Sequence, residues 1–177
     1  MRKTVITAAL LALSSGLFAT PVRADEAKPI EISLWTPVQI HDENTSIKGF
    51  RLNILYGVSK DVTGLDIGIV NRNTGVFKGL QWGIVGMAGD FSGWQNTFVN
   101  ITDGKFAGLQ GWGAIYNGGG TVTGVQVGLV NRAEAFEGFQ LGLVNVTETL
   151  HGLQIGLLNV VSSREKWKYL PIVSWSF

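Results

Sequence analysis

The chain of 177 residues contains no cysteine, only two histidines and only four prolines. Without cysteine it can form neither disulfide bonds nor thiolate metal sites, so the fold depends on burial and on backbone hydrogen bonds. The two histidines, His41 and His151, lie far apart in the sequence, and no zinc-binding spacing such as H-E-x-x-H occurs. We therefore expect no metal ion and no cofactor.

Charged residues are also scarce, at 15% of the chain. Without the first 24 residues, 11 basic residues face 13 acidic ones, a formal charge of −2. No basic patch remains that could account for binding to nucleic acid. The G-x-S-x-G motif of serine hydrolases is missing, and the glycine run at 118–120 lacks the lysine and hydroxyl residue of a phosphate-binding loop. The sequence therefore predicts a protein that is not an enzyme.

The N-terminus has the features of a secretory signal peptide. Arg2 and Lys3 precede an apolar stretch at 4–19, and Val22-Arg23-Ala24 forms a small-residue cleavage site. We predict that residues 1–24 are cleaved and that the protein is exported. No later apolar run has the length of a membrane-spanning helix.

Glycine, in contrast, is abundant, and one glycine recurs every 14–16 residues between residues 47 and 161. The eight copies of this repeat can be aligned on Gly49, Gly64, Gly79, Gly93, Gly108, Gly124, Gly138 and Gly152. An apolar residue stands two positions before each of these glycines. Self-similarity at a fixed short period is typical of solenoids and other repeat architectures.

Two amide residues recur with the glycine. Glutamine stands two positions after it in six copies, at Gln81, Gln95, Gln110, Gln126, Gln140 and Gln154. Asparagine stands seven positions after it in five copies, at Asn71, Asn100, Asn131, Asn145 and Asn159. In a β-solenoid, equivalent residues of successive turns lie about 4.8 Å apart. We therefore predict two structural ladders in which stacked amides form hydrogen bonds with one another.

The segment "GLQIGLLN" at 152–159 shows the pattern of a single copy. Leu153, Ile155 and Leu157 alternate with Gln154 and Gly156, which is typical of a strand with one buried apolar face. If each of eight turns directs about four apolar side chains inward, the core contains roughly thirty of them, each contributing about 1.5–3 kcal/mol before the cost in chain entropy.

These patterns predict an all-β protein, a β-solenoid of about eight coils of 14–16 residues. The coils occupy residues 47–161, and the segments 25–46 and 162–177 form strand-like caps. Proline is confined to these caps and to the predicted signal peptide. Its absence from the coils supports the prediction, because proline removes a ladder hydrogen bond.

The C-terminal residues permit an alternative. Tyr169, Pro171, Val173 and Trp175 alternate up to a terminal aromatic residue, Phe177, as in the last strand of outer-membrane β-barrels. The repeat period also accommodates a membrane strand of about 9–11 residues with a turn. Eight copies and two flanking strands would then form an antiparallel barrel of about ten strands. Whether Phe177 is an insertion signal for the outer membrane stays open.

The copies resemble a family of bacterial exported surface-repeat proteins, described chiefly from spirochaetes, whose units are close to "GLQIGLVN". The resemblance covers residues 31–177, including the entry "ISLWTPVQI" and the exit "YLPIVSWSF". It implies an exported, envelope-associated protein with no assigned activity and no catalytic residues.

Three tryptophans in the third to fifth copies, Trp82, Trp94 and Trp112, either fill the core or form an aromatic patch that binds a glycan or a protein. We therefore predict a non-enzymatic cell-envelope or surface protein, structural or partner-binding through a stacked β face. Its partner would be a protein or glycan at the cell surface, and association with the outer membrane is compatible with the sequence. The alternative is a small outer-membrane barrel, structural or pore-like.

Overall fold

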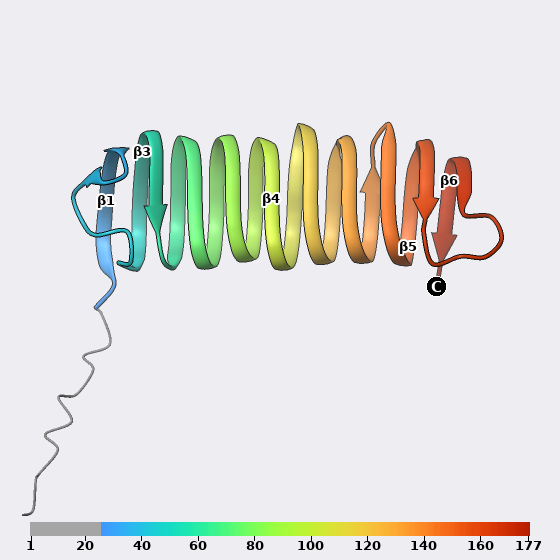
Figure 1. Ribbon diagram of the computed structural model, residues 1–177, viewed down its shortest axis with the longest axis horizontal. Coiled ribbons are helices and arrows are strands. Elements are labelled where there is room, and N and C mark those ends of the chain that lie inside the picture. Colours follow the sequence, from blue (N-terminus) through green and yellow to red (C-terminus); the bar gives the residue numbers. More distant parts are fainter. Residues whose placement is uncertain (1–25) are drawn as a thin grey trace, which may run out of the picture.

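The computed structural model describes residues 26–177, so the predicted signal peptide lies outside the described residues. The described chain is all-β and winds into stacked coils of about 14 residues, forming a β-solenoid of about eight turns (Figure 1). Its strands in chain order are β1 (Lys28–Trp35), β2 (Val38–Gln39), β3 (Ile47–Ser59), β4 (Val62–Leu141), β5 (Val144–Val161) and β6 (Tyr169–Ser176). The predicted β-solenoid is confirmed.

Neighbouring turns run parallel and in the register of the repeat. β3 pairs with the start of β4 so that Gly49 lies beside Gly64, and the end of β4 pairs with β5 so that Gly138 lies beside Gly152. Each pair joins equivalent positions of consecutive copies. The alternative of an antiparallel outer-membrane barrel is wrong, because the coils stack in one direction and successive strands of such a barrel alternate in direction.

Both ends of the solenoid depart from this stacking. At the N-terminal end β1 is parallel to β3, and the short β2 folds back antiparallel on β1. At the C-terminal end β6 runs antiparallel to β5. The antiparallel β2 and β6 therefore interrupt the parallel stacking at the two ends, which limits end-to-end pairing with other molecules.

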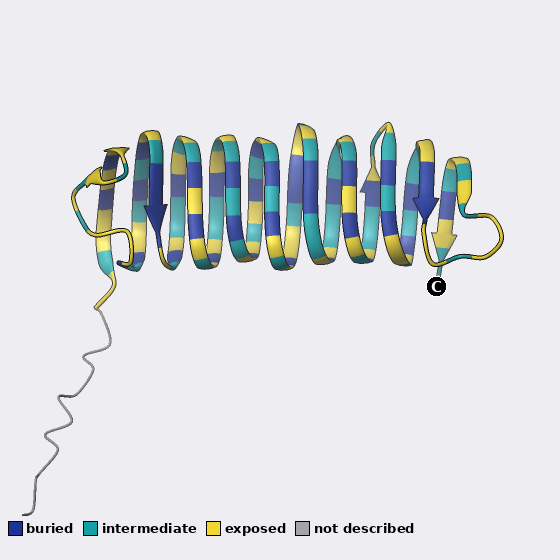
Figure 2. Ribbon diagram, viewed as in Figure 1, coloured by how far each residue is buried: buried dark blue, intermediate teal, exposed yellow. Residues whose placement is uncertain are grey.

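The interior differs from the prediction made from "GLQIGLLN". Leu157 is 72% exposed, whereas Gln154 is fully buried, so the alternating aliphatic residues face outward and the amides face inward. Figure 2 shows buried and exposed residues alternating along each coil. In-register stacking supplies the inward glutamines with partners in the adjacent turns, and this offsets the usual cost of burying them.

In every copy the apolar residue two positions before the glycine is buried beside these amides. These residues are Ile47, Val62, Phe77, Phe91, Phe106, Val122, Phe136 and Leu150. The ring of Phe91 stacks on those of Phe77 and Phe106, with centroids 4.6 and 5.3 Å apart. The core therefore combines this apolar column and a few further apolar residues, such as Ala88 and Ala133, with polar columns, and the estimate of about four inward apolar side chains per turn is wrong.

Candidate functional site

The glutamines form one continuous column inside the solenoid. The Nε2 of each residue donates to the Oε1 of the glutamine one turn earlier, at 2.6–3.0 Å. All six side chains are fully buried: Gln81, Gln95, Gln110, Gln126, Gln140 and Gln154. The column ties each turn to the next from within, in addition to the backbone ladder.

A buried ion pair ends the glutamine column on its N-terminal side. Gln81 Nε2 donates to Asp66 Oδ2 at 2.9 Å. Arg51 binds the same carboxylate through two bonds, Nε to Oδ1 at 2.8 Å and Nη2 to Oδ2 at 2.6 Å. Asn53 Nδ2 adds a bond to Asp66 Oδ1 at 3.0 Å. Arg51 and Asp66 are the two residues that replace glutamine in the first two copies, and neither side chain is exposed to solvent.

The asparagines form a second column that donates in the opposite direction, toward the C-terminus. Bonds of 2.7–2.8 Å connect Asn100, Asn117, Asn131, Asn145 and Asn159 in series. Asn71 accepts from Asn53 at 2.8 Å but lies outside that series, since Gly86 takes the asparagine position in the third copy.

Asn117 is the member of the asparagine column that the spacing did not predict. It stands nine positions after Gly108, because the fifth copy carries additional residues ahead of it. The dipeptide Tyr116-Asn117 corresponds to the Val-Asn pair of other copies, such as Val130-Asn131. An alignment that tolerates insertions would have found it by that signal.

The end of the glutamine column provides a test of its contribution to stability. In Gln154→Leu two neighbours lose a hydrogen bond, Gln140 Oε1 at 2.7 Å and Thr147 Oγ1 at 3.3 Å, whereas Gln154 Oε1 has no partner to lose. We expect the free energy of unfolding in urea to fall by about 1–3 kcal/mol, the cost of leaving buried polar groups unpaired. Thr149→Leu, at an exposed position of the same region, should change it by less than about 0.5 kcal/mol. Equal values for the two variants would contradict a stabilising column.

The outward positions carry the apolar residues that the interior lacks. We call the residues one, three, five and six positions after the repeat glycines the apolar face. Between residues 49 and 158 no charged residue occupies any of these positions, and their side chains in most copies are aliphatic or aromatic. In the seventh copy they are Phe139, Leu141, Leu143 and Val144, all at least partly exposed.

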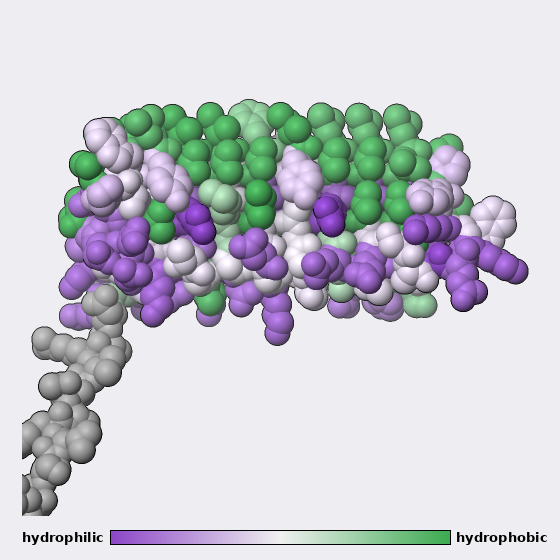
Figure 3. Space-filling model, viewed as in Figure 1, coloured by the Kyte–Doolittle hydropathy of each residue, from purple (hydrophilic) through white to green (hydrophobic). Residues whose placement is uncertain are grey.

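The apolar face continues into both caps. In β1, Ile30 and Ile32 are exposed beside Phe50 and Leu52 of the first copy. In β6, Trp175 and Val173 pair with residues 153 and 155 of the last copy. Figure 3 shows the resulting apolar band along the upper side of the solenoid over its whole length, with hydrophilic residues along the lower side.

Exposed charges of the coils are confined to the remaining part of each turn, from eight positions after one repeat glycine to one position before the next. This part contains Lys48, Lys60, Asp61, Arg72, Lys78, Asp90, Asp103, Lys105, Arg132, Glu134, Glu137 and Glu148. Each coil is therefore amphipathic in cross-section, and because the copies stack in register the whole molecule has one apolar side and one charged side.

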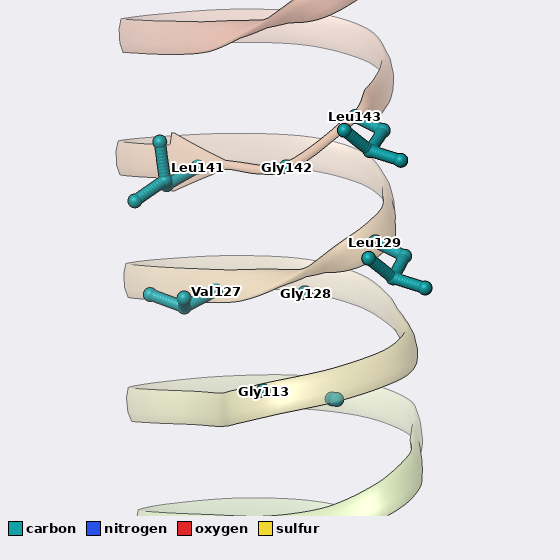
Figure 4. Close-up of a pocket in the computed structure, with 8 residues that line it drawn as sticks. Gly113, Val127, Gly128, Leu129, Leu141, Gly142 and Leu143 are labelled. Carbon is teal, nitrogen blue, oxygen red and sulfur yellow. The ribbon is translucent and has the colours of Figure 1, made fainter.

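A groove with a glycine floor runs along the apolar face. Gly128 and Gly142 form its floor, with Val127 and Leu141 on one wall and Leu129 and Leu143 on the other (Figure 4). The floor requires glycine, because a Cβ on Gly142 would overlap the carbonyl oxygen of Gly128 and lie 2.6 Å from Asn131 Nδ2. The asparagine column thus lies directly beneath the floor.

The groove extends toward the N-terminus past Gly113, which lines both halves. Its second half is lined by Trp82, Phe98 and Trp112, with the polar residues Asn96 and Thr97. Trp82 and Trp112 are 53% and 71% exposed. Trp94 is 37% exposed and does not line this half of the groove. The structure therefore places two of the three predicted tryptophans together in the groove, and none of the three fills the core.

Residues with titratable side chains do not gather in this region. His41 Nδ1 is 2.9 Å from Glu31 Oε2 in the N-terminal cap, away from the groove. Over residues 26–177 no three residues of the types His, Asp and Glu come together as a metal site would require. The same part of the chain has no helix with the length and apolar character needed to cross a membrane.

No family model, curated protein or solved structure matches the chain. The resemblance to bacterial surface-repeat proteins therefore stays a prediction. Function has to be argued from the surface that the solenoid displays.

Proposed function

We propose that this protein is a non-enzymatic, exported protein of the cell envelope that binds a partner through its apolar face. The observation that carries the proposal is the extent of this face, which is uncharged in every copy and continues from β1 to β6. Soluble monomers rarely expose contiguous apolar patches larger than a few hundred Å², and larger ones mark binding surfaces. Export is proposed from the N-terminal sequence.

The interior of the solenoid supports a binding role for the face. The glutamine and asparagine columns join each turn to the next, so the outward side chains are held on a stiff frame. A preorganised surface loses little conformational freedom on binding. The side chains that line the groove include no acid, base or nucleophile of the kind general acid–base catalysis needs, which favours binding over catalysis.

Cell fractionation tests the proposal. We expect the wild-type protein to sediment with the envelope and the double variant Leu129→Lys, Leu143→Lys to move to the soluble fraction, because it places two charges on the apolar face. Thr149→Lys, which adds a charge on the polar side, should behave as wild type. Protease treatment of intact cells should degrade a surface-exposed protein. Recovery of the wild-type protein in the soluble fraction would overturn the proposal.

A further inference from the structure

We infer that the partner of the apolar face is the acyl-chain layer of a phospholipid membrane, on which the solenoid lies lengthwise with its groove immersed. This inference rests on the proposed function and identifies the chemistry of its partner. Four observations support it: the absence of charge on the face, the hydrogen bonding of the backbone, the scarcity of side chains that can form hydrogen bonds, and the residues that border the face.

The first argument is the uninterrupted absence of charge. A protein partner occupies a patch, but here the uncharged surface extends over all eight copies and into the caps at both ends, as with Ile32 in β1 and Val173 in β6. An elongated surface with one apolar and one polar side is the arrangement of an interfacial amphipathic helix, whose apolar side is buried about 5–10 Å into the membrane boundary. The solenoid presents the same division on a β scaffold.

The second argument concerns backbone polar groups. In the hydrocarbon region of a membrane, a protein segment is stable only if its backbone N–H and C=O groups are paired within the protein. In the coils these groups bond to the turns before and after, as in the pairs Leu65 beside Phe50 and Leu153 beside Phe139. Most of the apolar face therefore runs across paired strands, with an irregularity in the register at Ile54 and Leu55 of the first copy. Immersion of the side chains on the paired segments leaves the backbone hydrogen bonds of those segments in place.

The third argument favours lipid over protein as the partner of the apolar face. Protein interfaces contain about one hydrogen bond per 100–200 Å² together with bridging water. In the coils the side chains of the apolar face that can form hydrogen bonds are Asn96 and the indoles of Trp82 and Trp94, and the insertion in the fifth copy adds Trp112 to the groove beside them. A second copy or another protein would find few partners there, whereas acyl chains need none.

The border of the face carries residues suited to the headgroup region. In the C-terminal cap Tyr169 pairs with Val160, one position past the last asparagine of the column, where the apolar face ends. Trp167 and Tyr169 are exposed, and Lys168 Nζ lies 5.8 Å from the centre of the Tyr169 ring. Tryptophan and tyrosine concentrate at membrane–water boundaries, and lysine extends its ammonium group from there into water.

Site-specific fluorescence on the full chain tests the inference, since the chain has no cysteine of its own. Leu143→Cys on the apolar face and Thr149→Cys on the polar side are each labelled with the fluorophore NBD and mixed with vesicles of phosphatidylethanolamine and phosphatidylglycerol. Both positions are exposed, and both variants carry the same N-terminal segment. We expect the emission at position 143 to shift to the blue and to be quenched by spin-labelled acyl chains, with no change at position 149.

A second measurement uses vesicle sedimentation. Leu129→Lys, Leu143→Lys should lower the partition coefficient at least about tenfold relative to Thr149→Lys, because two half-exposed leucines account for more than about 1.4 kcal/mol of transfer free energy. Unchanged emission at position 143, equal changes at both positions, or a change at 143 that depends on protein concentration without lipid would each overturn the inference. The last result would identify a second copy as the partner. If the protein sediments with the envelope in cells but does not bind vesicles, the proposed function stands and lipid is refuted as the partner.

Discussion

Asp66→Ala is expected to lower the free energy of unfolding by about 3–5 kcal/mol, measured by urea denaturation. The variant leaves the guanidinium of Arg51 without its counter-ion at a site with no solvent exposure. It also removes the acceptor for Asn53 and for Gln81, the first donor of the glutamine column. A buried charge without a partner is much more costly than the loss of the attraction alone, since the ion cannot be rehydrated while the fold persists.

The double variant Arg51→Gln, Asp66→Gln serves as the matched control. It places glutamine at the same column position in the first two copies, so the column can continue through both copies without the charges of the ion pair. We expect it to recover most of the stability lost in Asp66→Ala, because a buried ion pair is often replaceable at little net cost. Glu134→Ala, at an exposed carboxylate, should change stability by less than about 0.5 kcal/mol. A double variant less stable than Asp66→Ala would show that the ion pair has a role the column cannot replace.

Gly138→Ala is expected to have an effect of similar size, about 2–6 kcal/mol. The residue has φ of +131°, a conformation that L-residues with side chains rarely adopt, and a Cβ would overlap the carbonyl oxygen of Gly124 in the preceding turn. The estimate combines about 1–3 kcal/mol of backbone strain with a similar cost of overpacking. Relief by movement is limited, because ladder bonds on both sides hold the adjacent turns in place.

Gly113→Ala separates the two contributions. Gly113 also has a positive φ, +82°, but no atom lies within 4 Å of the site of its Cβ. Only the strain of about 1–3 kcal/mol should therefore remain, and thermal unfolding of the two variants should show a clearly lower melting temperature for Gly138→Ala. Equal melting temperatures would contradict close contact between turns at the repeat glycines.

The two columns and the apolar face depend on each other. An amide column uses inward positions without supplying hydrophobic stabilisation, so each copy places several of its apolar residues outside. The exposed leucines of the groove are therefore a consequence of the buried asparagines beneath it, as with Leu143 beside Gly142, which lies over the bond between Asn131 and Asn145. A protein that needed only stability could place its apolar side chains inside and its amides outside. A protein that needs a stiff apolar surface benefits from the opposite placement, which is found here.

The repeat in the sequence favoured the solenoid over the barrel that the C-terminal residues permitted. The steady period, the recurrence of Gln and Asn at the same offsets from glycine, and the exclusion of proline from the coils all favour an arrangement in which like positions meet. Parallel stacking in register is the arrangement that brings them together, since antiparallel neighbours move equivalent residues apart. The irregular fifth copy limited this reasoning, because its insertion displaced Asn117 from the expected offset.

The amino-acid sequence by itself determined that the chain coils at this period and that its amides stack, because both follow from identity between copies. Only the tertiary structure decided whether the apolar residues or the amides of each alternating segment face inward. Alternation defines two faces, and the usual assignment of the apolar one to the core assumes that polar groups need water. A stacked amide has its partners in the next turn, so Gln154 is buried and Leu157 is exposed. The antiparallel turn of β6, which extends the apolar face into the C-terminal cap, likewise depends on contacts that no single repeat encodes.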